Sequence, residues 1–151
     1  MSGEKATRKL KLRAWQVILA TLVLLICVAS ALLVALMDQT TLLGNAYVTA
    51  ISSGNEGLAE LLGDHFSENN VANQQLLRQD IRRDLAWLGG KELSDVTATR
   101  EQTLSGQWVT VVRFSYKPPN SNEAPRNGTL RVKTDKWWLL TYVRTVEVVQ
   151  P

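Results

Sequence analysis

The chain has one cysteine, Cys27, and one histidine, His65. A single cysteine cannot form an intramolecular disulfide. One histidine without available cysteines leaves only carboxylates to complete a metal site, so no metal and no other cofactor is expected. Cys27 follows Ile26 rather than a small residue and lies within an apolar run. We therefore expect an unmodified side chain that faces lipid or another helix.

Charge is absent from residues 14–37, which read AWQVILATLVLLICVASALLVALM. A helix that spans a bilayer needs about 20 predominantly apolar residues. At about 1.5 Å per residue, this segment would form a helix of roughly 36 Å, which is long enough to cross with some tilt. The sequence therefore predicts a transmembrane helix over residues 14–37.

Basic residues are concentrated just before that run. Residues 1–13 contain five of the 17 Lys and Arg and one of the 14 Asp and Glu, which leaves 12 basic and 13 acidic side chains for residues 38–151. This near-neutral domain lacks the electrostatic footprint that nucleic-acid binding requires. The basic tail instead predicts a cytoplasmic N-terminus and a lipid bilayer as partner. The predicted membrane-anchoring residues are Lys9, Lys11, Arg13 and Trp15.

A cleaved signal peptide is the alternative to an uncleaved anchor, since a basic start and an apolar core suit both. Residues 28–30 (Val-Ala-Ser) could serve as a cleavage site. A signal core is usually about 7–15 residues long, whereas this run continues to Met37. The anchor interpretation gives a basic cytoplasmic tail (1–13), a transmembrane helix (14–37) and an exported domain (38–151). Both interpretations place that domain outside the cytoplasm.

Three amphipathic helices are predicted after the apolar run, because apolar residues recur there at helical spacing. The first helix carries its apolar face on Leu43, Tyr47, Ala50 and Ile51. It ends at Ser52–Asn55, and a short second helix follows and ends at Gly63. The third helix is predicted from about Asn73 to Leu88, with Gly89–Gly90 as its stop.

Beyond Gly90 the sequence turns to β-branched and aromatic residues, separated by Ser, Gly, Pro and Asn, which indicates antiparallel strands. The predicted strands are Leu93–Gln102, Trp108–Tyr116, Thr129–Lys133 and Trp137–Val149. Tight turns are predicted at Ser105–Gly106 and at Thr134–Lys136, and a loop at Pro118–Gly128. Helices followed by consecutive strands predict an α+β fold with three helices packed on one face of the sheet.

Three segments carry a resemblance to a known superfamily: AYVTAISSGNEGLAELLGDHF (46–66), GGKELSDVTATREQTLSGQWVTVVRFSY (89–116) and TLRVKTDKWWLLTYVR (129–144). Their order of helix, break, short helix and Trp-marked strands resembles the nuclear transport factor 2-like (cystatin-like) superfamily, in particular its small bacterial membrane-anchored domains. The resemblance implies a cone-like domain with a curved sheet, and often a homodimer. Because that superfamily includes enzymes, carriers and adaptors, it implies no single activity.

A catalytic hypothesis rests on His65, which follows Asp64 at the end of the second helix. Asp64 could orient His65 as a general acid or base in an isomerase or dehydratase. Adjacent residues of a helix point in different directions, however, and a helix end commonly carries solvated Asp and His. Catalytic members of the resembled superfamily place Asp, His or Tyr inside the cone, whereas the strands here carry mostly Val, Leu, Thr and aromatics. We therefore expect a binding domain rather than an enzyme.

Aromatic residues are the other candidates for a site. The candidate interface or ligand-lining residues are Trp108, Tyr116, Trp137, Trp138 and Tyr142. In a continuous strand Trp137 and Trp138 would point to opposite faces, so one of them is expected to cover an edge or a partner. The sequence thus predicts a membrane-anchored binding or accessory domain that docks a protein or a small apolar ligand through its sheet face. A membrane protein complex or a homodimer is the expected assembly.

Overall fold

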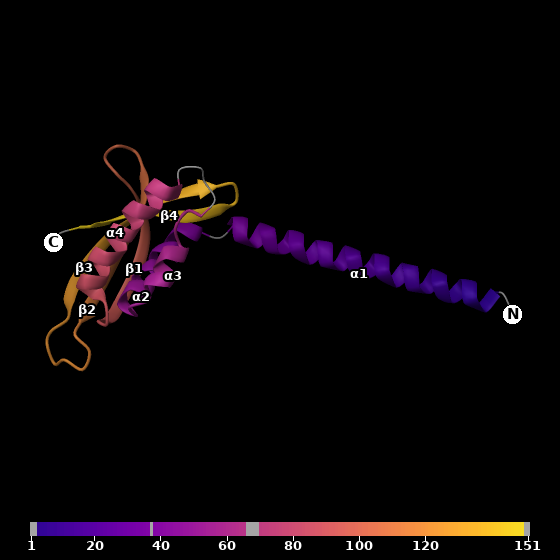
Figure 1. The fold of residues 1–151 in the computed structure, drawn as a ribbon, viewed down its shortest axis with the longest axis horizontal. Coiled ribbons are helices and arrows are strands. Elements are labelled where there is room, and N and C mark those ends of the chain that lie inside the picture. Colours follow the sequence, from indigo (N-terminus) through magenta and orange to yellow (C-terminus); the bar gives the residue numbers. More distant parts are fainter. Residues whose placement is uncertain (1–2, 37, 66–69, 150–151) are drawn as a thin grey trace. The chain divides into compact units, whose positions relative to one another are not determined.

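The computed structural model describes residues 3–36, 38–65 and 70–149, without the side chains of residues 3–14, 34–36, 70 and 137. The described chain is α+β, as predicted, with four helices and one four-stranded antiparallel sheet (Figure 1). The helices are α1 (Gly3–Leu36), α2 (Gln39–Ser52), α3 (Glu56–Leu61) and α4 (Asn70–Leu88); the strands are β1 (Glu92–Gln102), β2 (Trp108–Lys117), β3 (Arg126–Trp137) and β4 (Leu140–Val148). The chain divides into two compact units, Met1–Met37 and Asp38–Pro151.

The first unit contains α1, a helix of 34 residues. Its segment Trp15–Leu33 is long and apolar enough to cross a membrane, and none of it is buried. Two hydroxyl groups interrupt the apolar surface, and each donates to a backbone carbonyl one turn earlier: Thr21 to Val17 and Ser30 to Ile26, both at 2.8 Å. Because these hydroxyls are satisfied within the helix, they do not oppose an apolar environment.

In the second unit, the ends of the helices agree with the predicted breaks. Asp38 caps α2 by accepting from the amide of Thr40 at 3.2 Å. Gly54 has a φ of 72°, which favours glycine, and the side chain of Asn55 caps α3 by accepting from Leu58 at 3.0 Å. α4 begins at Asn70, three residues before the predicted start at Asn73. The predicted start rested on the spacing of apolar residues alone. α4 ends at the predicted glycines, and Gly90 has a φ of 73°.

The core lies between the helices and one face of the sheet (Figure 1). It is built from buried residues of α2 and α4 together with alternate strand residues, which include Val112, Phe114, Leu130, Val132, Val143 and Val146. α2 approaches β2 closely at Gly44. A Cβ atom at this position would lie 2.9 Å from methyl carbons of both Thr110 and Val112. Leu77, Ile81 and Leu88 of α4 are buried, in agreement with the helical spacing of apolar residues that predicted this helix.

The turn between the last two strands differs from the prediction. Thr134–Lys136 lies inside β3, where it pairs with Thr141–Val143 of β4, and the chain reverses at Trp138 and Leu139. Trp138 has a φ of 54°, a backbone conformation that is unusual for a tryptophan. The prediction that Trp137 and Trp138 alternate within one strand was therefore wrong. The side chain of Trp137 lies outside the described part of the chain.

The start of β3 also differs from the prediction. Residues 126–128 were expected to belong to a loop, but they pair with Phe114–Tyr116 of β2. Gly128 lies opposite Phe114, and the ring of Phe114 covers it so closely that a Cβ atom at position 128 would lie 2.5 Å from the ring. Gly128 therefore allows the ring of Phe114 to pack closely against the backbone of β3.

The strand order β1-β2-β3-β4 places both hairpin turns at one end of the sheet. These turns are residues 103–107, between β1 and β2, and residues 138–139, between β3 and β4. The loop of residues 118–125 lies at the opposite end, at the lower left in Figure 1. The two ends of the sheet differ in chemistry, because residues 118–125 read PPNSNEAP, whereas both hairpin turns carry exposed leucine.

Candidate functional site

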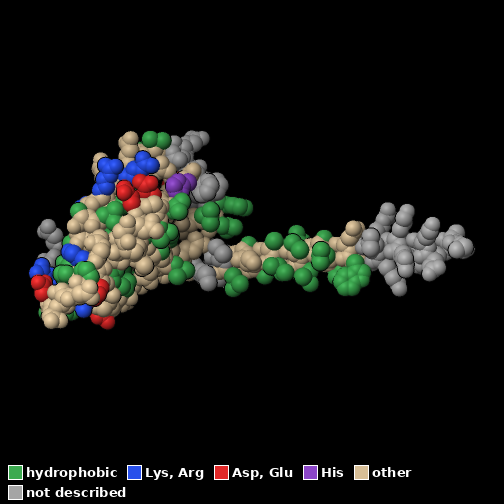
Figure 2. Space-filling model, turned by 60° about the horizontal axis from the view of Figure 1, so that its bottom comes forward, with side chains coloured by type: hydrophobic (Ala, Val, Ile, Leu, Met, Phe, Trp, Pro, Cys, Tyr) green, Lys and Arg blue, Asp and Glu red, His purple; other side chains and the backbone are tan. Residues whose placement is uncertain are grey.

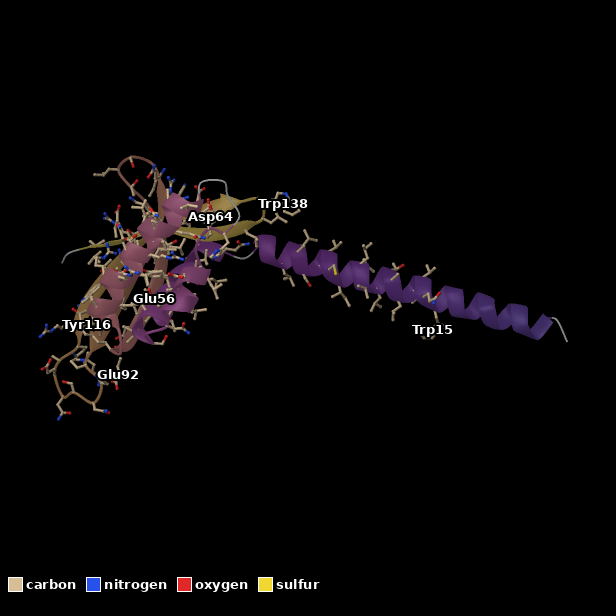
Figure 3. All side chains as sticks on the ribbon, viewed as in Figure 1. Trp15, Glu56, Asp64, Glu92, Tyr116 and Trp138 are labelled. Carbon is tan, nitrogen blue, oxygen red and sulfur yellow. The ribbon has the colours of Figure 1, made fainter. Side chains whose placement is uncertain are left out.

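The β3–β4 turn presents three large apolar side chains in succession. Trp138 is 84% exposed, Leu139 45% and Leu140 47%. Figure 3 shows Trp138 at the end of the hairpin, directed away from the sheet. We refer to Trp138–Leu140 as the hairpin tip. The sequence predicted that one of Trp137 and Trp138 covers an edge or a partner, but it did not reveal that two exposed leucines follow Trp138.

The hairpin tip is held against the beginning of α2 by Gln39. The side-chain amide of Gln39 donates to the carbonyl oxygen of Leu139 at 3.2 Å, and its oxygen accepts from the backbone amide of Thr141 at 3.0 Å. The cap of α2 precedes it directly, where the hydroxyl of Thr40 lowers the pKa of Asp38 by donating to its carboxylate at 2.6 Å. The first turn of α2 and the hairpin tip therefore form one end of the domain.

An apolar pocket of about 170 Å³ lies beside the tip. It is lined by Leu43, Leu61, Leu62, Gly63, His65, Leu140, Thr141 and Tyr142. Burial raises the pKa of Tyr142, and the carboxylates of Asp135 and Asp64 act in the same direction. Leu61, 68% exposed, extends the apolar surface from the tip towards α3. Figure 2 shows hydrophobic side chains gathered on one side of His65 and charged ones on the other.

His65, the candidate catalytic residue, is held by Glu60 and Gln74. Its Nε2 lies 3.2 Å from the carbonyl oxygen of Glu60, which can only accept, so Nε2 carries the proton. Its Nδ1 then accepts from the side-chain amide of Gln74 at 3.2 Å. Gln74 also donates to the backbone carbonyl of the buried Asp64 at 3.0 Å. Both ring nitrogens are engaged in hydrogen bonds. To act as a general base, His65 would therefore have to lose the hydrogen bond from Gln74 to its Nδ1.

The surroundings of His65 form a pocket of about 140 Å³, lined also by Leu77 and Arg78. Arg78 pairs with Glu60 at 2.9 Å on the rim. Among the described residues, no group of three or more His, Cys, Asp or Glu is placed to hold a metal ion. The pocket therefore offers one imidazole and one ion pair, and catalysis by His65 with Asp64 stays a prediction.

A buried polar network links α2, α4 and β4, and sequence reasoning missed it. The hydroxyl of Tyr47 donates to Asp84 at 2.7 Å, and Arg83 donates to the other carboxylate oxygen of Asp84 at 2.8 Å. Arg83 also pairs with Asp80 at 3.0 Å, and Asp80 accepts from the amide of Val146 at 2.8 Å. Asp84 is fully buried. Every one of these groups has a partner within the fold, which indicates a structural role.

This network perturbs the ionisation of its members. Burial raises the pKa of Asp84 and of Asp80 above their ordinary value, while the hydrogen bonds they accept oppose that rise. Burial, together with the neighbouring Asp84 carboxylate, raises the pKa of Tyr47 far above its ordinary value. The spacing could have revealed Asp84, because it lies three residues after Ile81 and four before Leu88 on the buried stripe.

The structure separates the other candidate aromatics. Trp108 begins β2 and is 54% exposed, with the guanidinium of Arg100 4.8 Å from its ring centroid. Tyr116 lies near the other end of β2, where its hydroxyl accepts from the indole of Trp87 at 3.2 Å. The ring of Tyr116 lies 5.5 Å from that of Trp87, edge to face. Tyr116 therefore belongs to an aromatic cluster beside the core, whereas Trp108 lies at the end that also carries the hairpin tip.

The outer face of the sheet carries paired charges around two valines. Glu101 accepts from Arg113 at 2.7 Å, and Lys133 pairs with Glu147. Val109 and Val111 are only 3% exposed, although they point away from the helices. They line a hollow of about 410 Å³ whose other lining residues are Glu101, Gln102, Thr103, Leu104, Ser105 and Arg131. Leu104 projects fully into solvent beside this hollow.

Of the predicted anchoring residues, the structure describes the side chain of Trp15, which is 70% exposed on α1. Lys9, Lys11 and Arg13 belong to the same helix, but their side chains lie outside the described part of the chain. No protein-family model, curated protein or solved structure matches this chain. The likeness to the nuclear transport factor 2-like superfamily therefore stays a prediction.

Proposed function

We propose that this protein is a single-pass membrane protein that holds a small α+β domain close to the outer surface of the bilayer. The observation that supports the proposal is the segment Trp15–Leu33, which is long and apolar enough to cross a membrane and has no part buried. Each large apolar side chain gains about 1.5–3 kcal/mol on leaving water, so such a helix needs an apolar environment. The basic residues before it favour a cytoplasmic N-terminus.

The domain would act as a binding or accessory module, with the outer sheet face as its docking surface. Two buried valines and the exposed Leu104, surrounded by Glu101, Arg113 and Arg131, resemble the apolar centre and charged rim of a protein interface. Ligand pockets are typically about 300–1,000 Å³ and enclose most of the ligand. The described pockets on the helix side measure about 140–190 Å³, which favours a protein over a small apolar ligand.

The partner would itself be a membrane protein or a second copy of this chain. Only Met37 and Asp38 separate α1 from α2, so the domain has little reach away from the surface. A cone-like form of the domain, as in the resembled superfamily, belongs to this proposal. Support for it comes from helices that cover one sheet face and from β-bulges in the β1–β2 and β3–β4 pairs, since bulges bend and twist strands.

Two experiments test the proposal. Protease added outside intact cells should degrade the domain and spare a tag placed at the N-terminus; sparing of the domain would contradict an external location. For the docking surface, a photo-crosslinking residue at Leu104 should give a defined adduct in native membranes. The same residue at Asn122, in the loop at the opposite end of the sheet, should not. Equal adducts from both positions, or none from Leu104, would contradict docking through this face.

A further inference from the structure

We propose that the hairpin tip is a second membrane contact of this protein, with Trp138, Leu139 and Leu140 inserted into the headgroup region of the bilayer that α1 crosses. The inference rests on the proposed anchoring by α1. It assigns a different segment, about 100 residues later in the chain, to the same membrane surface.

The position of Gln39 in the chain is the first argument for the proposal. Gln39 is the third residue after Leu36, the last residue of α1. Even a fully extended chain covers only about 11 Å over three residues, so Gln39 must lie near the point where the chain leaves the bilayer. The two hydrogen bonds from the Gln39 side chain to Leu139 and Thr141 then bring the hairpin tip to the same level.

The residue types of the hairpin tip are the second argument for the proposal. A two-residue hairpin turn with positive φ is ordinarily made by Gly, Asn or Asp. Here Trp138 occupies that position with a φ of 54° and stays 84% exposed. Neither turn geometry nor core packing accounts for Trp-Leu-Leu at this place. Tryptophan is, however, enriched where proteins meet the headgroup region, because its ring is apolar and its N–H is polar.

The unequal distribution of exposed apolar residues between the two ends of the domain is the third argument for the proposal. Exposed apolar residues cluster at the end of the domain that holds the hairpin tip, where Leu42 is 54% exposed and Leu61 68%. The loop at the opposite end of the sheet, residues 118–125, contains no large apolar residue. A lipid surface fits this distribution, since it is apolar and lies where the chain itself requires it to be.

The test uses the full chain in phosphatidylcholine–phosphatidylglycerol vesicles, with an environment-sensitive fluorophore on a single cysteine. The label is placed at the native Cys27, or at Leu139→Cys or Asn122→Cys in a Cys27→Ser background. Leu139→Cys keeps the backbone carbonyl that accepts from Gln39. In vesicles whose acyl chains carry bromine near the headgroups, the label at 139 should lose about half of its emission, as expected for insertion to about 5–10 Å.

The matched label at Asn122 should keep its emission. The label at Cys27 lies near the middle of the predicted span, so it should be quenched in vesicles whose acyl chains carry bromine near their ends. Quenching at Cys27 without quenching at 139 would overturn the inference and leave the anchor intact. No quenching at Cys27 would overturn the anchor, and the inference with it. A blue shift of the label at 139 without quenching would show that protein, and not lipid, covers the hairpin tip. Equal quenching of the labels at 139 and 122 would show that the domain lies flat on the bilayer. Both results contradict insertion of the hairpin tip alone. As a label-free check, Trp138→Ser should reduce the bromine quenching of tryptophan emission.

Discussion

Gln39 and Leu139 lie 100 positions apart in the sequence and are joined by a hydrogen bond of 3.2 Å between the Gln39 side chain and the Leu139 carbonyl. The same side chain accepts from Thr141 at 3.0 Å, so it spans the turn of the β3–β4 hairpin. This bridge fixes the apolar hairpin tip beside the first turn of the domain. It also explains how a turn can form at Trp138 without glycine or asparagine.

Replacing Gln39 by alanine should loosen the hairpin. Each of the two hydrogen bonds contributes about 0.5–1.5 kcal/mol, so the backbone amide of Thr141 should exchange its hydrogen about tenfold faster. Hydrogen exchange of the full chain in detergent, followed over residues 137–142, measures this change. Gln75→Ala on the exposed side of α4 is the matched control and should leave exchange in the hairpin as it was. Unchanged exchange in the Gln39 variant would contradict the bridge.

Replacing Tyr47 by phenylalanine should destabilise the domain. The change removes one donor from the fully buried carboxylate of Asp84 and should cost about 1–3 kcal/mol of unfolding free energy. Tyr142→Phe, at a half-buried position, should stay within about 0.5 kcal/mol. Chemical unfolding in detergent, followed by tryptophan fluorescence, compares the two. Equal stabilities would mean that the Tyr47 hydroxyl does not support the network.

The buried carboxylates also set a direction for the dependence of stability on pH. Burial raises the pKa of Asp84 above 3.8, so the folded protein holds this proton after the unfolded chain has released it. The resulting stabilisation is complete below the unfolded pKa and is lost as the pH rises through the folded pKa. The stability difference between the natural chain and Asp84→Asn should therefore shrink as the pH rises above about 4, where an aspartate of the unfolded chain loses its proton. A difference that grows over this range would contradict the assignment.

Gly44→Ala should destabilise the domain, although alanine favours helices. The added methyl group would lie 2.9 Å from carbons of Thr110 and Val112, both of which are buried. Overpacking costs about 1–3 kcal/mol, and helix propensity returns up to about 1 kcal/mol. The control is Gly57→Ala in α3, where the nearest atom would lie 3.8 Å away, and this change should be neutral or stabilising. Thermal unfolding measures the stability of both variants. A Gly44→Ala variant more stable than the natural chain would contradict the close packing of α2 on β2.

The sequence predicted the helices because their limits depend on local chemistry. Gly54, Asn55 and Gly90 end or begin helices through their own backbone and side-chain properties, and these effects do not require the rest of the fold. Apolar spacing likewise identified the buried face of α4. The α+β class followed from the order of these elements.

The last hairpin could not be predicted in the same way, because its position depends on distant residues. Asp135 suggested a turn, but the sheet pairing continues past it, and the turn at Trp138 is supported by Gln39. The contact between Tyr47 and Asp84 depends on the packing of two helices, although the spacing of Asp84 placed it on the buried face. The predicted strand already placed Trp108 and Tyr116 at its two ends, but the ring contact of Tyr116 with Trp87 depends on the packing of α4 against the sheet.

The measurement that tests the central claim most directly is the mass of the natural protein in membranes washed at alkaline pH. An anchor that is kept in the mature chain predicts that the protein stays in the membrane pellet and that its N-terminal peptides include residues before Trp15. A protein released into the soluble fraction, with a mature N-terminus near Ala31, would contradict the anchor and show that the apolar segment is removed as a signal peptide.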